Sequence, residues 1–147
     1  MGFLDSDTIP TNAVIIIPGA ELYHFGVLTS NVHMSWMRAV CGRLKSDYRY
    51  SKDIVYNNFP WPSPSLEQRK KIEDTARGIL DARALYPDSS LADLYDPLTM
   101  PPELRKVHTA NDRAVMQAYG MPIKETDEAA CVAWLMRLYQ EMTAGRK

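Results

Sequence analysis

The chain has 147 residues, of which 46% are hydrophobic and 24% are charged, in the range of a soluble protein that buries a core. Its length leaves room for one domain or for two small ones. The formal net charge of −1 excludes a strongly basic protein, so bulk electrostatics alone do not indicate nucleic-acid binding.

The two cysteines and the short apolar runs indicate in which cell compartment the protein is expected. Cys41 and Cys131 lie far apart and form neither a disulfide framework nor, with the three histidines, a zinc-ligand spacing. We expect both thiols to be small buried groups in a reducing cytoplasm. The longest aliphatic run, residues 13–17, is too short to cross a membrane, and the N-terminus lacks a signal-peptide pattern. No membrane partner is therefore expected.

Strand-like and helical patterns alternate in the first part of the chain. Residues 13–17 and 22–28 are apolar runs that favour strands, and a helix is expected from Ser30 to Gly42. Residues 43–58 return to alternation of aromatic and polar positions, which favours a strand pair. These elements predict a small, partial β-sheet region with one helix.

A proline-rich stretch separates this part from a helical one. Three prolines within residues 60–64 cannot continue a helix or a central strand, so we predict domains at 1–62 and 63–147, with Trp61 packed at the hinge. Helix-start signals follow at Ser65, Ser90, Pro102 and Thr126, and Gly120 is a stop signal. The predicted fold class is α+β, with a C-terminal bundle of three to four helices.

A basic strip on the first part is a candidate footprint for a polyanion. Five bases fall within fifteen residues, and only one acid, Asp47, interrupts them. A solvated protein surface is the alternative explanation of this strip. Its members are Arg38, Arg43, Lys45, Arg49 and Lys52.

Signals for catalysis are absent from the sequence. The seven glycines are dispersed and form no phosphate-binding loop, and no carboxylate–lysine arrangement typical of a Mg²⁺ nuclease follows a strand. Residues 57–62 share an asparagine and two prolines with the Asn-Pro-Pro-Tyr loop of amino-methyltransferases, but Phe59 and Trp61 break its order. We therefore predict no catalytic, cofactor-binding or metal-binding residue in this chain.

One family resemblance rests on residues 24–51 and 55–62. The helix from Ser30, the step Gly42-Arg43-Leu44 and the end Tyr56-Asn57-Asn58-Phe59-Pro60-Trp61 occur in the same order in single-chain type II restriction–modification enzymes of the MmeI kind. The resemblance is strong over residues 10–62 and looser over the helical remainder.

This resemblance implies a function and a parent enzyme. Residues 1–62 would be part of a DNA target-recognition domain and 63–147 the C-terminal helical domain of an adenine-N6 DNA methyltransferase with endonuclease activity. Such an enzyme uses S-adenosylmethionine and Mg²⁺, in upstream domains whose motifs this sequence lacks. The expected partners are double-stranded DNA and those upstream domains, and the chain alone is expected to self-associate through an unpaired strand edge.

The expected base readers are alternate residues of one extended segment. Lys45, Asp47 and Arg49 would share an edge, because side chains of a strand alternate. Arg49 is a second candidate reader of guanine, with a salt bridge to Asp47 as its alternative. The resemblance implies that Lys45 and Asp47 together read the last base pair of the site. Lysine suits guanine and aspartate suits cytosine, so we expect G·C. Asn12 is a further candidate, as a reader of adenine or as a turn residue.

The remaining candidates are phosphate contacts. Arg43, Ser51 and Lys52 flank the expected readers, and Ser30 and Asn31 open a helix whose free amides favour anions. His33 is expected in the core or at an interface. The resemblance adds a possible DNA-contact cluster in the helical domain, residues 69–71, with a solvated helix face as its alternative. A protein-interaction or scaffold module is the competing function for the whole chain.

Overall fold

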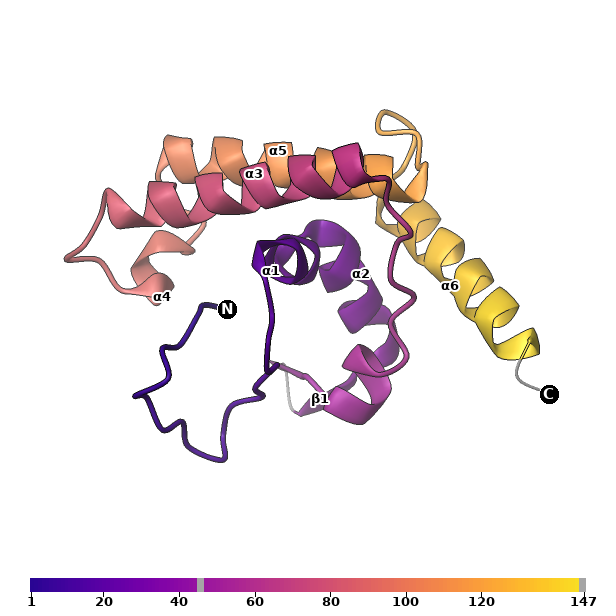
Figure 1. Cartoon of the computed structure of the whole chain (residues 1–147), viewed down its shortest axis with the longest axis horizontal. Helices are drawn as coiled ribbons and strands as arrows, with labels where there is room; N and C mark the ends of the chain where they lie inside the picture. Colours follow the sequence, from indigo (N-terminus) through magenta and orange to yellow (C-terminus); the bar gives the residue numbers. More distant parts are fainter. Residues whose placement is uncertain (45–46, 146–147) are drawn as a thin grey trace.

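The computed structural model describes residues 1–44 and 47–145, and for residues 42–44 and 47–49 the backbone alone. None of its helices in this part of the chain is long and apolar enough to span a bilayer. The elements, in chain order (Figure 1), are α1 (Leu22–Thr29), α2 (Asn31–Val40), β1 (Gly42–Leu44), β2 (Asp47–Arg49), the π-helical turn η1 (Lys52–Tyr56), α3 (Leu66–Ala84), α4 (Leu91–Leu94), α5 (Pro102–Tyr119) and α6 (Glu128–Ala144).

The predicted α+β class is wrong. Over the described residues the fold is helical, apart from one antiparallel hairpin in which β1 and β2 pair three residues each. A two-stranded ribbon of this length is not a sheet domain and does not stand alone. Its pairs are Gly42 with Arg49, Arg43 with Tyr48, and Leu44 with Asp47.

The predicted strand at 22–28 is instead helix α1. A short apolar run fits a buried strand and a buried helix equally well, and five of the eight residues of α1 are buried. A local signal favours the helix, because the backbone N–H of Glu21 donates to His24 Nδ1 at 3.0 Å in a capping-box arrangement.

The predicted strand at 13–17 is also absent, and the segment is irregular. Its apolar side chains Val14, Ile15 and Ile16 are 52%, 46% and 55% exposed. The expected second strand of the 43–58 segment is partly replaced by η1. Strand propensity did not decide these segments, because it acts only where a neighbouring strand is available to pair.

The helices of the two predicted parts, 1–62 and 63–147, pack against one another. Figure 1 shows α3 and α5 running antiparallel along one side, with α1 and α2 beneath them and α6 diverging at the end. α1 packs on α3, and α6 packs on α2 rather than closing a separate bundle. The division at residue 62 stays a prediction. The main core draws on both parts, with Val27, Trp36, Val55 and Phe59 from the first and Ile72, Val115, Tyr119 and Leu135 from the second.

The predicted helix ends of the second part are largely confirmed. Ser65 and Gln68 form a reciprocal capping box at α3, and Ser90 and Asp93 form one at α4. Gly120 ends α5 in the left-handed conformation, at φ 75°. The predicted cap of α6 is wrong by one residue: Asp127 accepts from the N–H of Ala130, and Thr126 donates to the Pro122 carbonyl instead.

A glycine sets the spacing between α1 and the helices above it. A Cβ on Gly26 would lie 2.7 Å from Ile72 Cγ2 and 3.2 Å from Ala76 Cβ, both on α3. The Gly26 carbonyl lies in the last turn of α1, where no helical N–H is available. The buried Asn111 amide of α5 donates to it at 2.8 Å, so a single crossing joins three helices.

We predict opposite effects of alanine at two helix-interior glycines. Gly26→Ala should lower the free energy of unfolding by about 1–3 kcal/mol, because the new methyl group overpacks the crossing. Gly78→Ala on α3 meets nothing closer than Val107 Cγ1 at 3.6 Å. It should raise that free energy by up to about 1 kcal/mol through helix propensity. Urea denaturation of both variants is the measurement, and equal effects would refute the close crossing.

Candidate nucleic-acid interface

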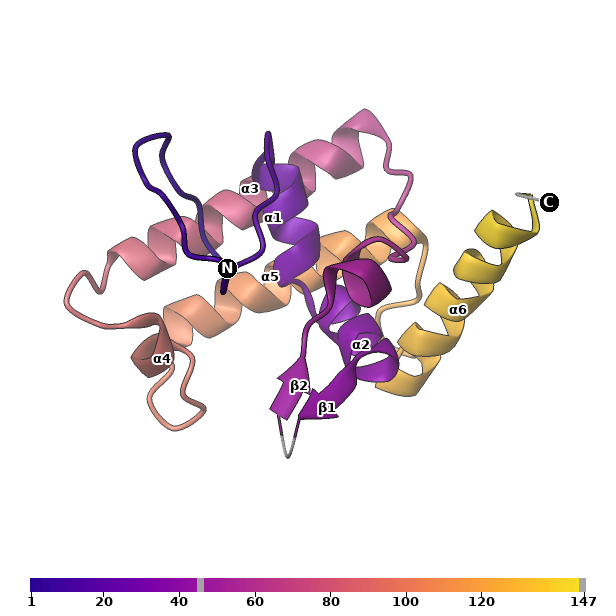
Figure 2. The same cartoon turned by 90° about the horizontal axis from the view of Figure 1, so that it is seen from below.

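The β1–β2 hairpin projects from the helical body. Figure 2 shows it extending between α4 and α6, away from the α3–α5 pair. Its first strand continues directly from α2, which ends with the N–H of Cys41 bonded to the Met37 carbonyl at 2.9 Å. Gly42 therefore opens β1 and does not cap α2 as the sequence predicts. The hairpin is the part of the described chain with the shape of a two-stranded ribbon.

A buried histidine anchors the C-terminal end of the hairpin, where β2 ends. Tyr50 follows β2 directly, and its hydroxyl lies 3.0 Å from Nε2 of His33 in the first turn of α2. His33 is only 1% exposed, which confirms the expected core position. Burial lowers the pKa of His33 to about 4 and raises that of Tyr50 to about 12, so both groups are neutral at pH 7.

The segment after the hairpin is fixed by aromatic packing. Trp36 on α2 donates from Nε1 to the Val55 carbonyl at 3.0 Å, and the Phe59 ring meets the His33 ring edge to face at 4.5 Å. Trp61 packs against the rings of Tyr23, His24, Tyr56 and Phe59, which supports the predicted contact at the hinge. The segment that follows the hairpin is thus held by packing against α1 and α2.

A carboxylate from α5 occupies the start of α2. Asp112 accepts the N–H of Asn31 on Oδ1 and the Asn31 amide on Oδ2, both at 2.8 Å. Burial raises the pKa of Asp112, and the Asn31 bonds partly oppose this. Ser30, predicted to meet phosphate, is buried and bonds to the Val27 carbonyl and the N–H of His33. Asp112 therefore stands where the sequence predicts an anion site.

The predicted base readers divide between the hairpin and the N-terminal segment. Asp47 and Arg49 occupy alternate positions of β2. Lys45 lies outside the described residues, as do the side chains of Asp47, Arg49 and Arg43. Asn12 lies in an exposed turn before α1, outside the hairpin. Base reading by these residues stays a prediction.

The other cations near the hairpin differ in their surroundings. Arg38 on α2 forms an ion pair with Glu128 of α6 at 2.7 Å, so its charge is partly neutralised. Lys52 is exposed at the start of η1. The Ser51 side chain accepts from the N–H of Ile54 and caps that turn. The exposed Lys52 is thus the described cation next to the hairpin that is best placed for a phosphate.

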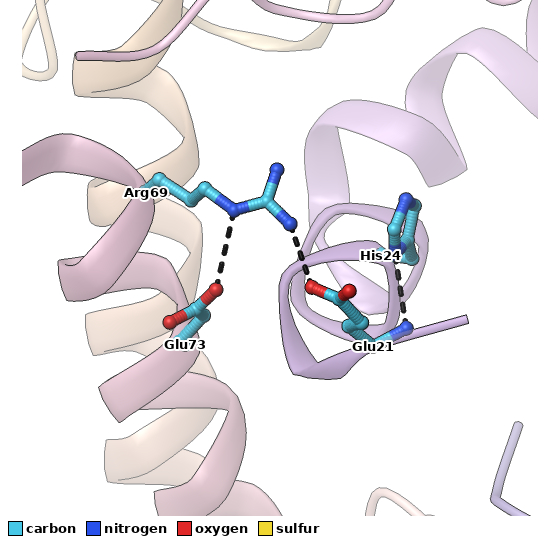
Figure 3. A network of polar contacts seen from close by, with 4 residues as sticks. All are labelled: Glu21, His24, Arg69 and Glu73. Atoms are coloured by element: carbon cyan, nitrogen blue, oxygen red, sulfur yellow. Dashed lines mark hydrogen bonds and ion pairs between the residues drawn. The ribbon is translucent and has the colours of Figure 1, made fainter. Parts of the chain in front are cut away.

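Two of the three cations at the start of α3 are ion-paired. Arg69 bonds to Glu21 at 2.8 Å and to Glu73 at 3.3 Å, as Figure 3 shows. Lys70 pairs with Asp74, and Lys71 donates to the Gln117 side chain. This arrangement favours a solvated, ion-paired helix face over the DNA contact that the resemblance suggested for residues 69–71.

A cavity of about 580 Å³ adjoins the base of the hairpin, between α2, α4 and α5. Arg83 donates to the Tyr95 hydroxyl, which lies 2.6 Å from Nε2 of His108. Burial, with the nearby charge of Arg83, lowers the pKa of His108 to about 4. Within the residues that the structure describes, no group of three His, Cys, Asp or Glu side chains is arranged to hold a metal ion.

The main residues missed at the sequence level are long-range partners. Asp112 is 81 positions from Asn31, and Glu128 is 90 positions from Arg38. No local pattern marks them. Tyr50 is different, because the alternation of residues 43–58 singled it out as a strand position without indicating its partner.

Two family models match the chain and together cover nearly all of it. Residues 1–63 match the model described as MmeI, target recognition domain, and residues 65–146 match MmeI, C-terminal domain. The chain belongs to the MmeI family. The segment that matches the target recognition domain and the segment that matches the C-terminal domain share the core described above.

Two longer proteins resemble this MmeI-family chain. It is 45% identical over 143 residues to DNA methyltransferase A of Bacillus subtilis (strain 168), covering 97% of this chain and 16% of that protein. It is 52% identical to a solved type IIL restriction–modification enzyme, MmeI in complex with DNA, with a TM-score of 0.83 over 87% of this chain and 17% of that chain. The chain thus spans about a sixth of the length of these relatives.

The two buried histidines predict a loss of stability in acid. Their pKa values of about 4 lie below the ordinary 6.5, so the unfolded state binds more protons between these values. Stability is therefore full above pH 6.5 and falls as the pH drops toward 4. His33 is almost fully buried and should contribute roughly 2 kcal/mol to the decline between pH 7 and 5, whereas solvent screening makes the share of the more exposed His108 smaller.

The measurement is urea denaturation at pH 7, 6 and 5. His108→Gln removes one of the two titrating groups and should make the decline shallower by that smaller share, whatever its effect at pH 7. Parallel curves for wild type and variant would contradict the assignment.

Proposed function

We propose that this chain recognises a specific double-stranded DNA sequence for an MmeI-type restriction–modification enzyme and is not catalytic by itself. The observation that carries this proposal is the match of residues 1–63 to the MmeI target recognition domain. The 52% identity to an enzyme solved in complex with DNA supports it.

The geometry of the hairpin is suited to reading a groove. The major groove of B-DNA admits a two-stranded β-ribbon, and the β1–β2 hairpin projects as such a ribbon from an anchored base. Three bases of the strip, Arg43, Lys45 and Arg49, fall within the hairpin segment. We assign phosphate contacts to the two ends of this segment, at Arg43, Ser51 and Lys52.

The proposed base readers are Lys45, Asp47 and Arg49, with Asn12 as a separate reader of adenine. Lys45 and Asp47 suit a terminal G·C pair, because lysine donates to guanine O6 and N7 and aspartate accepts from the cytosine amino group. The guanine would lie on the strand that carries the methylated adenine.

The whole enzyme is proposed to be a site-specific adenine-N6 DNA methyltransferase with endonuclease activity, acting in the cytoplasm. S-adenosylmethionine and Mg²⁺ would bind elsewhere in that enzyme, because this sequence has no glycine-rich loop and its described residues offer no carboxylate cluster. The exposed run Val14–Ile16 is the proposed contact with the rest of the enzyme, and the isolated chain would self-associate through it.

A scaffold function is the competing proposal, since Val14–Ile16 and the exposed residues of α6 also suit a protein partner. The two functions differ in their dependence on salt. DNA binding releases counterions from phosphates, whereas a scaffold has no affinity for a duplex.

We predict that the chain binds duplex DNA and that its dissociation constant rises about ten- to a hundredfold between 50 and 200 mM salt. Lys52→Gln should make the salt dependence shallower by about one unit of log–log slope. Lys70→Gln is the matched control, since Lys70 pairs with Asp74 on α3, and it should leave the slope unchanged. Fluorescence anisotropy measures both; no duplex binding by the wild type would favour the scaffold.

A charge exchange in the hairpin should invert the terminal base pair. Lys45→Glu with Asp47→Arg places the acid and the base in exchanged positions, so selection from a random duplex pool should change the terminal pair from G·C to C·G. The expected discrimination is about 1–3 kcal/mol. The same exchange on α3, Lys70→Glu with Asp74→Arg, should leave the selected sequence unaltered. An unchanged terminal pair in the hairpin variant would end this assignment.

A further inference from the structure

The two ends of the readout hairpin are attached to opposite ends of α2. The first end continues from Val40 through Cys41 at the C-terminus of the helix. The second end returns to the N-terminal turn, where Tyr50 meets His33 at 3.0 Å. His33 and Val40 are seven positions apart, which is about 10 Å along a helix. Two attachments so far apart determine the tilt of the hairpin, whereas the first alone would act as a hinge.

The imidazole of His33 is itself held in place by packing and by a hydrogen bond of its backbone. The Phe59 ring meets it edge to face at 4.5 Å, and the His33 backbone N–H bonds to the Ser30 hydroxyl. Its Nδ1 has no hydrogen-bond partner among the described residues, so the bond to Tyr50 is the polar contact of this ring. A buried group with a single partner makes that partner costly to lose.

The same helical turn is also tied to the C-terminal part. Asn31, two residues before His33, holds both carboxylate oxygens of Asp112 on α5. The C-terminal end of the hairpin is therefore connected through the first turn of α2 to the α3–α5 pair. Its orientation is set relative to the whole helical body.

We propose that His33 and Tyr50 are positioning residues for base readout: their hydrogen bond holds the β1–β2 hairpin at the angle at which its side chains meet the bases. This inference rests on the proposed DNA-recognition function. The two residues act through the direction of the β1–β2 hairpin, which follows α2 and precedes η1.

The test compares two hydroxyl deletions in the 147-residue chain. Tyr50→Phe removes the bond to His33. Tyr119→Phe is the matched control, because its buried hydroxyl donates to the Pro60 carbonyl at 2.7 Å, away from the hairpin. Both variants should lose similar stability in urea denaturation. Each protein is then used to select duplexes from a random pool, and the bound sequences are determined.

Tyr50→Phe should lower the enrichment at the hairpin-read positions by about fivefold, the equilibrium factor for one net hydrogen bond, and leave the salt dependence of binding intact. Tyr119→Phe should retain the wild-type motif. Equal motifs from the two variants would overturn the positioning assignment. If the wild type itself enriches no motif, the proposed function fails instead, so the two failures are distinct.

A second pair of variants tests the bond from the histidine side. His33→Gln can place an amide near the position of Nε2 and should keep most of the selectivity, whereas His33→Leu should lose as much as Tyr50→Phe. In the Tyr50→Phe background the two changes should give the same motif, because the bond is already absent. A further loss for His33→Leu in that background would show that the ring acts through packing, and would overturn the proposal.

Discussion

The close crossing of α1 over α3 supports the rest of the molecule. Gly26 has no side chain, so the backbone of α1 approaches Ile72 and Ala76 directly, and the buried Asn111 amide satisfies a carbonyl that the short helix leaves free. The amide is held in turn, since the Thr75 hydroxyl lies 2.9 Å from its Oδ1. Without this contact, α1 and α2 would have no fixed position against the α3–α5 pair, and the hairpin that follows α2 would have none either.

The helix ends of the second part were predictable because their signals are local. A serine three residues before a glutamine or aspartate, and a glycine after an apolar stripe, satisfy backbone groups within one turn. The first part failed for the complementary reason. The run at 22–28 is apolar around most of its circumference because α3, α2 and α5 all contact it, and a buried strand would show the same composition. Residues 13–17 have strand propensity, but no strand of the described chain pairs with them.

The candidate site shows a similar division. The clustering of bases around residues 38–52 was visible in the sequence, because charge density is a local property. The contacts that orient this segment were not, since Asn31 meets Asp112, and Tyr119 meets Pro60, over separations of 81 and 59 residues. The charges of Arg38 and Arg69 are moderated by acids on other elements, which residue counts cannot reveal. Composition therefore located the basic strip. It could not show which of the cations in the strip form ion pairs with acids on other elements.

These contacts bear on how the two family-matched segments depend on one another. The recognition segment contributes α1, α2 and the hairpin, but its helices are covered by Ile72 and Val115 from the C-terminal segment and oriented by Asp112. The two segments share one core. If the recognition segment alone were replaced by that of a relative, the core would be exposed and the contacts that orient the hairpin would be lost. Residues at the start of α2 and along α5 must therefore stay matched, whereas the hairpin sequence between Cys41 and Tyr50 is bounded by anchors at both ends. A change of the hairpin sequence within those bounds leaves the anchors in place, so the proposed base readout is separate from the packing that supports it.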